Sequence, residues 1–232
     1  MSAPGYPAPA RPPVVRPLWS LAGPALGAMV AAGLLTAPIG PLGSAISRDL
    51  GLSTMAVTMT VVAPYAVTTA ALVVPGYLLG RRWPTATGVP ALVLLVLGSV
   101  VSAFAPGAAL MAVGGVVVGL GAGTVIGVAL ALSGQLGRWR SQARLVLGLA
   151  LGAALLLGPV VSGIVAQAVS WRTVFLVGVP VAAVALTGTI ASGIAMLAVR
   201  GSRPSPQAAP ATTTLPPAKP ASAAQHADYP SI

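Results

Sequence analysis

Long apolar stretches alternate with short polar connections along most of this chain. Six stretches carry no charged residue in their interior, and each is long enough to cross a bilayer as a helix, which takes about 20 residues. We expect them at residues 21–43, 57–80, 88–105, 108–135, 145–168 and 173–199. None of the six shows the alternating pattern of outer-membrane strands. The pattern predicts an all-α fold, an integral membrane bundle of six transmembrane helices within residues 18–200.

The two ends of the chain have a different composition. Residues 1–17 are rich in Pro and Ala, and residues 201–232 return to Pro, Ala, Thr and Ser. Such segments bury too little apolar surface to fold by themselves. We therefore expect two disordered tails. The first apolar stretch exceeds the 7–15-residue core of a signal peptide, so we expect it to remain as the first span.

Basic residues divide unequally between the two sides of this topology. Only Arg48 and Arg172 fall on the side opposite the N-terminus. The side of the N-terminus receives Arg11, Arg16, Arg81, Arg82, Arg138, Arg140, Arg144, Arg200, Arg203 and Lys219. Because cytoplasmic loops of membrane proteins carry the excess of Lys and Arg, both termini are expected in the cytoplasm. The expected location is the inner or plasma membrane, with the lipid bilayer as the main surrounding partner.

Composition excludes several classes of function. Only 6% of the residues are charged, against about 25% in an ordinary soluble domain. The net charge of +10 is scattered over span ends and is not clustered with stacking aromatics, so we expect no nucleic acid partner. With no cysteine, and His226 in a tail as the single histidine, we expect no metal site and no other cofactor. Catalytic groups are absent at membrane depth, so we do not expect an enzyme.

Two motifs follow one another at the fifth stretch and the entry to the sixth. They are Gly158-Pro159-Val-Val-Ser162-Gly163 and Trp171-Arg172-Thr-Val-Phe175. Together they resemble the antiporter motif, and the tryptophan-arginine entry that follows it, in the drug/proton antiporter branches of the major facilitator superfamily of transporters. Physically, Pro159 removes an amide donor and crowds the turn near Leu155, which predicts a bend.

The loop after the second stretch is similar to that family's cytoplasmic signature, but incompletely. Gly76, Leu78 and Arg81 fit, whereas Gly80 stands at the position of the family's aspartate. In the family that aspartate joins a charge relay that latches one conformational state, so the resemblance implies that this latch cannot form here. Arg81 and Arg82 then either retain a part of the relay or only hold the loop in the cytoplasm.

The fourth stretch resembles a third motif helix of the family. Gly119 and Gly121 fit its glycine part, and the expected arginine falls at Gly115. Glycines also recur every fourth residue along this stretch, at Gly115, Gly119, Gly123 and Gly127. Such a smooth face serves close helix packing. The alternative is a cleared wall for a substrate.

The resemblance covers residues 18–200 and implies the first six helices of a transporter that normally has twelve or fourteen. The substrate of such a transporter lies between two six-helix halves, each made of inverted three-helix repeats. The resemblance places spans 1, 2, 4 and 5 around this cavity. The candidate polar side chains there are Thr36, Thr58, Tyr65, Thr69, Thr124, Ser162 and Gln167. Thr58, Tyr65 and Thr69 share a helical stripe that either faces the cavity or packs on a neighbouring helix.

Energy coupling is the weak point of a transporter hypothesis. Antiporters of this kind use an intramembrane carboxylate, and no span here contains Asp or Glu. Asp49 is expected in a loop, as a solvated pair with Arg48.

Two hypotheses on the function follow. The chain is a transporter half that moves a small apolar or amphipathic solute, as in multidrug efflux, and forms a homodimer or binds a second six-span half. Alternatively it is a non-transporting accessory, regulatory or truncated membrane protein.

Overall fold

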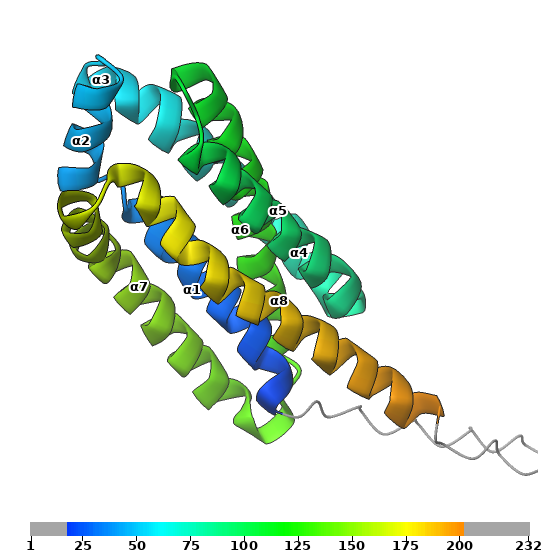
Figure 1. The fold of residues 1–232 in the computed structure, drawn as a ribbon. Coiled ribbons are helices and arrows are strands. Elements are labelled where there is room, and N and C mark those ends of the chain that lie inside the picture. The colour runs from blue at the N-terminus through cyan, green and yellow to red at the C-terminus, as the bar shows by residue number, and fades with distance from the viewer. Residues whose placement is uncertain (1–17, 202–232) are drawn as a thin grey trace, which may run out of the picture. The chain divides into compact units, whose positions relative to one another are not determined.

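The helical bundle consists of six long helices and several short ones (Figure 1). The computed structural model describes residues 18–201, and no strand occurs among them. The helical segments are the 3-10 turn Leu18–Leu21, α1 (Ala22–Thr36), α2 (Pro41–Asp49), α3 (Thr54–Val57), the π-helical turn Thr58–Val62, α4 (Ala63–Arg82), α5 (Pro84–Ala103), α6 (Ala108–Ser133), the 3-10 turn Gly137–Trp139, α7 (Arg140–Ala168) and α8 (Trp171–Gly201). Six of these segments are long and apolar enough to cross a membrane. The prediction of an all-α bundle with six transmembrane helices is confirmed.

The tails lie almost entirely outside the described residues. Residues 1–17 and 202–232 are not described, and Gly201 ends α8. The expectations for Arg11, Arg16, Arg203, Lys219 and His226 therefore also lie outside the described part of the chain.

The first spanning segment is shorter than the sequence predicted. It covers Trp19–Thr36, so the expected end at residue 43 is wrong. Pro38 has no amide donor, and Gly40 adopts a φ of 103°, a conformation that glycine reaches without a Cβ clash. The chain then enters α2, whose first residue is a proline with a φ suited to a first helical turn.

The other spanning segments differ from the expected bounds by about one turn or less, except the fifth, which begins at Gly137, eight residues before the expected start. They cover Thr54–Arg82, Pro84–Ala103, Ala108–Ser133, Gly137–Ala168 and Trp171–Ala198. The second segment begins early because Ser53 caps α3, its side chain accepting a hydrogen bond from the amide of Ala56 at 3.2 Å. Its end on Arg82 places two arginines in the last helical turn.

Helix α6 is the most buried spanning helix, and glycines let α4 and α5 approach it. A Cβ on Gly76 of α4 would lie 2.7 Å from the Cα of Thr124, and a Cβ on Gly121 of α6 would lie 2.5 Å from the amide nitrogen of Leu95. Real Cβ atoms do not come this close to backbone, so only glycine permits these contacts. A Cβ on Gly119, Gly123 or Gly127 would likewise meet the backbone of α4. The glycine face of α6 is therefore a packing surface occupied by α4.

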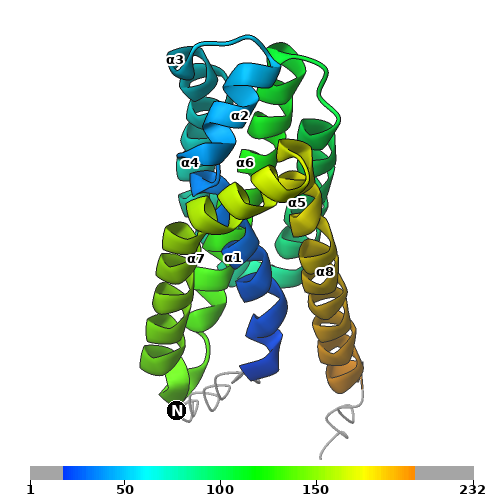
Figure 2. The ribbon, with the colours of Figure 1, turned by 60° about the vertical axis from the view of Figure 1, so that its left-hand side comes forward.

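Helices of the first half of the bundle pack against helices of the second half. The fourth spanning helix, α6, packs against α4 and α5, and the first, α1, packs against α7. Helix α1 also touches α8, since a Cβ on Gly23 would lie 2.7 Å from the carbonyl oxygen of Ala185. In Figure 2, α1 lies between α7 on its left and α8 on its right. The first three spanning helices are α1, α4 and α5, and the last three are α6, α7 and α8. The first helix of each set lies between the second and third helices of the other set, as in inverted repeats.

Candidate functional site

Helices α1 and α7 meet at a seam around the proline of α7. The Oγ1 of Thr36 donates a hydrogen bond to the carbonyl oxygen of Leu155 at 2.8 Å. This is the carbonyl four residues before Pro159, which has no N–H to offer it. The hydroxyl of Ser162 donates to the carbonyl of Ala37 at 3.0 Å. Two hydroxyls therefore join the end of α1 to α7 on either side of Pro159.

Glycines bring the two backbones of this seam together. A Cβ on Gly158 would lie 2.6 Å from the carbonyl oxygen of Gly33 in α1. A Cβ on Gly163 would lie 3.1 Å from the ring of Pro41, at the start of α2. The motif residues of α7 thus hold α1 and α2 by close contact, and Thr36 and Ser162 use their hydroxyls on backbone carbonyls within the seam.

An apolar groove adjoins the seam. It has a volume of about 240 Å³ and is lined by residues of α1, α7 and α8. The lining residues are Val30, Gly33, Leu34, Ala37, Ala154, Leu157, Gly158, Val161, Ser162, Val165, Val174, Val177, Gly178 and Val181. Ser162 carries the only polar side chain among them, and none is charged. The groove can accept an apolar group but offers almost no hydrogen bonding.

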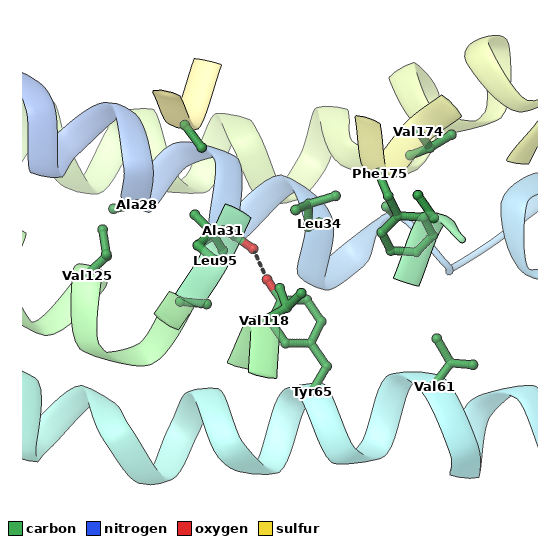
Figure 3. Packing of buried hydrophobic residues seen from close by; sticks show 14 of the residues in the cluster. Ala28, Ala31, Leu34, Val61, Tyr65, Leu95, Val118, Val125, Val174 and Phe175 are labelled. Carbon is green, nitrogen blue, oxygen red and sulfur yellow. Dashed lines mark hydrogen bonds between the residues drawn. The ribbon is translucent and has the colours of Figure 1, made fainter. Parts of the chain in front are cut away.

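The polar stripe expected on the second span is broken. The hydroxyl of Tyr65 is buried and donates to the carbonyl of Ala31 on α1 (Figure 3). Thr69 is buried as well, and its hydroxyl has no partner among the described residues. Thr58 is exposed and bonds its own helix at the carbonyl of Thr54, 3.0 Å away. A π-helical turn changes the helical register between Thr58 and Tyr65, and no sequence pattern indicated it.

Two further candidates also lie apart from the groove. The Oγ1 of Thr124 donates to the carbonyl of Leu120 in its own helix at 2.8 Å. Gln167 is exposed in the last turn of α7. The structure therefore places one of the seven polar candidates, Ser162, in the groove lining, with Thr36 beside it in the seam.

A second polar cluster lies where α2 ends and α8 begins. The indole Nε1 of Trp171 donates to Oδ2 of Asp49 at 2.9 Å, and the Nη2 of Arg172 lies 3.5 Å from the same oxygen. Arg172 also reaches the carbonyl of Ala105, after α5, at 3.5 Å. The expected pair of Asp49 with Arg48 is therefore wrong, because α2 continues through these residues and turns the carboxylate toward α8. The sequence singled out Trp171 and Arg172 as a motif, but not as partners of Asp49.

Packing closes the position of one missing motif charge, at Gly80, and leaves a tight fit at the other, Gly115. A Cβ on Gly80 would lie 2.9 Å from the Cα of Val128 on α6, so an aspartate would not fit without moving a helix. A Cβ on Gly115 would lie 3.3 Å from the carbonyl oxygen of Val61. Arg81, next to Gly80, forms no ion pair within residues 18–201 and instead lies over the ring of Tyr77 at 5.8 Å.

No group of His, Cys, Asp or Glu side chains within residues 18–201 could hold a metal ion. The polar interactions of the described bundle are mainly hydroxyls on backbone carbonyls, the Asp49 cluster and arginines on aromatic rings.

Comparison with known proteins supports this architecture. The sequence matches the family described as the Major Facilitator Superfamily over residues 24–226, which includes nearly all of the six spanning helices. No curated protein matches the chain significantly. The exchanged packing of the two three-helix sets agrees with the organisation of such transporters. This chain is a multi-pass membrane protein that belongs to the Major Facilitator Superfamily.

Proposed function

We propose that this chain is a transporter half of the drug-efflux type that moves a small apolar or amphipathic solute. The observation that carries the proposal is the groove of about 240 Å³ beside the α1–α7 seam, in which Ser162 is the only polar side chain. A strongly polar solute would lose its hydration there without compensating hydrogen bonds. An apolar group would be bound by the valines and leucines of the lining.

A second six-helix bundle completes the transport pathway in this proposal. Helix α7 offers a surface on which this second bundle could pack. Only 11% of its membrane-spanning part is buried, compared with 67% for α6. Gly148 and Gly152 lie four residues apart on α7, and a Cβ on either would meet no atom within 4 Å. Two small residues at this spacing permit close approach of another membrane helix. The partner is a second copy of this chain or a separate six-span half.

Transport follows the solute gradient in our proposal unless the partner bundle supplies an acid. Asp49 is the only carboxylate of residues 18–201, and its oxygen is bound by Trp171 and Arg172. No spanning helix carries an acid that could exchange a proton during transport. Proton coupling would therefore need an acid from the partner bundle.

Reconstitution tests the proposal. The purified chain in lipid vesicles should accelerate the entry of a neutral or a cationic lipophilic dye. Val177→Trp fills the groove and should lower the flux severalfold. Val184→Trp is a matched control, since Val184 is also exposed on α8 but does not line the groove. Equal effects of the two substitutions would argue against the groove as the solute site.

A second candidate function is supported by the close packing at Gly80. A side chain there would meet the backbone of α6, so the bundle has no room for the aspartate that joins the charge relay of related transporters. A non-transporting accessory or regulatory protein would keep the fold and lose this machinery. The absence of flux from the chain alone, and from the chain with a co-reconstituted six-span partner, would favour this function.

A further inference from the structure

The charges of the bundle are distributed very unequally between its two ends. Five arginines lie where α4 ends and α7 begins: Arg81, Arg82, Arg138, Arg140 and Arg144. The single carboxylate of residues 18–201, Asp49, lies at the opposite end and is paired with Arg172. The five arginines therefore have no counter-anion within the described part of the chain.

Three of these arginines share one corner of the bundle. The Nε2 of Gln135, after α6, donates to the backbone carbonyl of Arg81 at 3.1 Å and so joins the end of α4 to the α6–α7 connection. The guanidinium of Arg82 lies over the ring of Trp83 at 5.5 Å, and that of Arg138 lies over Trp139 at 5.2 Å. We call Arg81, Arg82 and Arg138, with these two tryptophans, the arginine corner.

The guanidinium groups of this corner keep their hydrogen-bond donors available. Within residues 18–201, Arg81, Arg82 and Arg138 make ring contacts but no side-chain hydrogen bond or ion pair. A guanidinium above an aromatic face still points its N–H groups outward, where they can bind phosphate oxygens in pairs. The corner therefore has donors available for an oxyanion.

An exposed apolar strip leads into the corner along α4. Val74, Leu78 and Arg82 follow one another at intervals of four residues and so lie on one helix face. Val74 is 63% exposed and Leu78 is 59% exposed. Trp83 and Trp139 are also exposed, as is typical of residues at a membrane–water interface. An apolar strip that ends in a cationic group matches a phospholipid, with its acyl chain below its phosphate.

We propose that the arginine corner binds the headgroup of an anionic phospholipid from the surrounding leaflet. Arg82, which ends the apolar strip, binds the phosphate, and Arg81 and Arg138 add positive charge, while Val74 and Leu78 contact the acyl chain. A second copy of this chain is not a suitable occupant, because its own corner carries the same positive charge. The apolar strip favours a lipid over a free anion, which would gain nothing from Leu78.

The proposal is tested by lipid retention on the purified full chain in detergent. Phosphatidylglycerol and phosphatidylcholine are added at equal concentration, and the bound lipids are counted by native mass spectrometry. We expect phosphatidylglycerol to be retained in preference. The triple variant R81Q/R82Q/R138Q should weaken its retention at least about tenfold, since each arginine near an anionic surface contributes roughly a fivefold factor.

Matched variants separate a site from a general charge effect. Arg48→Gln removes an arginine at the other end of the bundle and should leave retention unchanged. R81K/R82K/R138K keeps the charge but loses the paired donors of guanidinium, so its retention should be intermediate. Leu78→Ser should weaken phosphatidylglycerol retention without affecting inorganic phosphate. Each variant is first checked for helical content and a single gel-filtration peak.

Several results would overturn the proposal. Equal retention of the two lipids by the wild-type chain is one, and equal losses in R48Q and the triple variant are another. Displacement of phosphatidylglycerol by inorganic phosphate at the same concentration would identify a free-anion site instead. None of these measurements depends on transport activity.

Discussion

Thr36 of α1 donates its hydroxyl to the carbonyl oxygen of Leu155 on α7, and this is the carbonyl that Pro159 leaves without an intrahelical donor. A backbone carbonyl without a partner is costly inside a bilayer, where water cannot replace the lost hydrogen bond. The side chain of α1 thus compensates for the proline of α7. The hydrogen bond lost at Pro159 and the attachment of α7 to α1 are therefore one structural feature.

Replacing Thr36 with valine should reveal this compensation. Thr36→Val keeps the shape of the side chain but removes its donor, and we expect a loss of about 1 kcal/mol in unfolding free energy. The loss should shrink in a Pro159→Ala background, because alanine supplies the missing N–H to Leu155. A double-mutant cycle by denaturation in mixed micelles measures this coupling. Thr187→Val is the control, since Thr187 is exposed and bonds only its own helix. Additive effects of the two seam substitutions would contradict the interpretation.

Gly158 and Gly152 should respond differently to the same substitution. A Cβ on Gly158 would lie 2.6 Å from the carbonyl oxygen of Gly33, so Gly158→Ala must push α1 and α7 apart and should lower the melting temperature by several degrees. Gly152→Ala meets no atom within 4 Å and improves helix propensity, so it should be neutral or slightly stabilising. Thermal unfolding of the monomer in detergent distinguishes them. Equal destabilisation would mean that the α1–α7 contact is not the close one described.

The Asp49 cluster should contribute modestly to stability. The side chains of Arg172 and Asp49 are 44% and 48% exposed, so their ion pair is expected to contribute about 1 kcal/mol or less. Asp49→Asn keeps an acceptor for Trp171 and should lose only the charge component, which added salt also weakens. Asp49→Ala loses both interactions and should cost more. Arg48→Gln should have no effect, and a loss as large as that of Asp49→Asn would support the pairing first expected from the sequence.

The sequence could predict the six spans because charge is costly in lipid, so the arginines mark where each helix leaves the membrane. It could not predict the partner of Asp49, because Trp171 lies 122 residues away and reaches it only after α2 and α8 have packed. The hydrogen bond from Thr36 to the carbonyl of Leu155 could not be predicted for the same reason, since these residues are 119 positions apart. The prediction that Thr58 and Tyr65 share one helix face was wrong for a local reason. A π-helical turn between them changes the helical register without a clear sequence signal.

The proposed topology is tested by cysteine labelling, for which the absence of native cysteine is an advantage. Ser141 is exposed in the first turn of α7, at the arginine-rich end, and Ser44 is exposed on α2 near the opposite end. The ends of α4 and α7 at the first end carry five arginines, while the opposite end has two arginines with a carboxylate. The positive-inside rule therefore places Ser141 in the cytoplasm. We expect a membrane-impermeant maleimide added to intact cells to label Ser44→Cys but not Ser141→Cys. Permeabilised cells should label both, which controls for accessibility. Labelling of Ser141→Cys in intact cells would reverse the orientation and would place both the arginine corner and the termini outside.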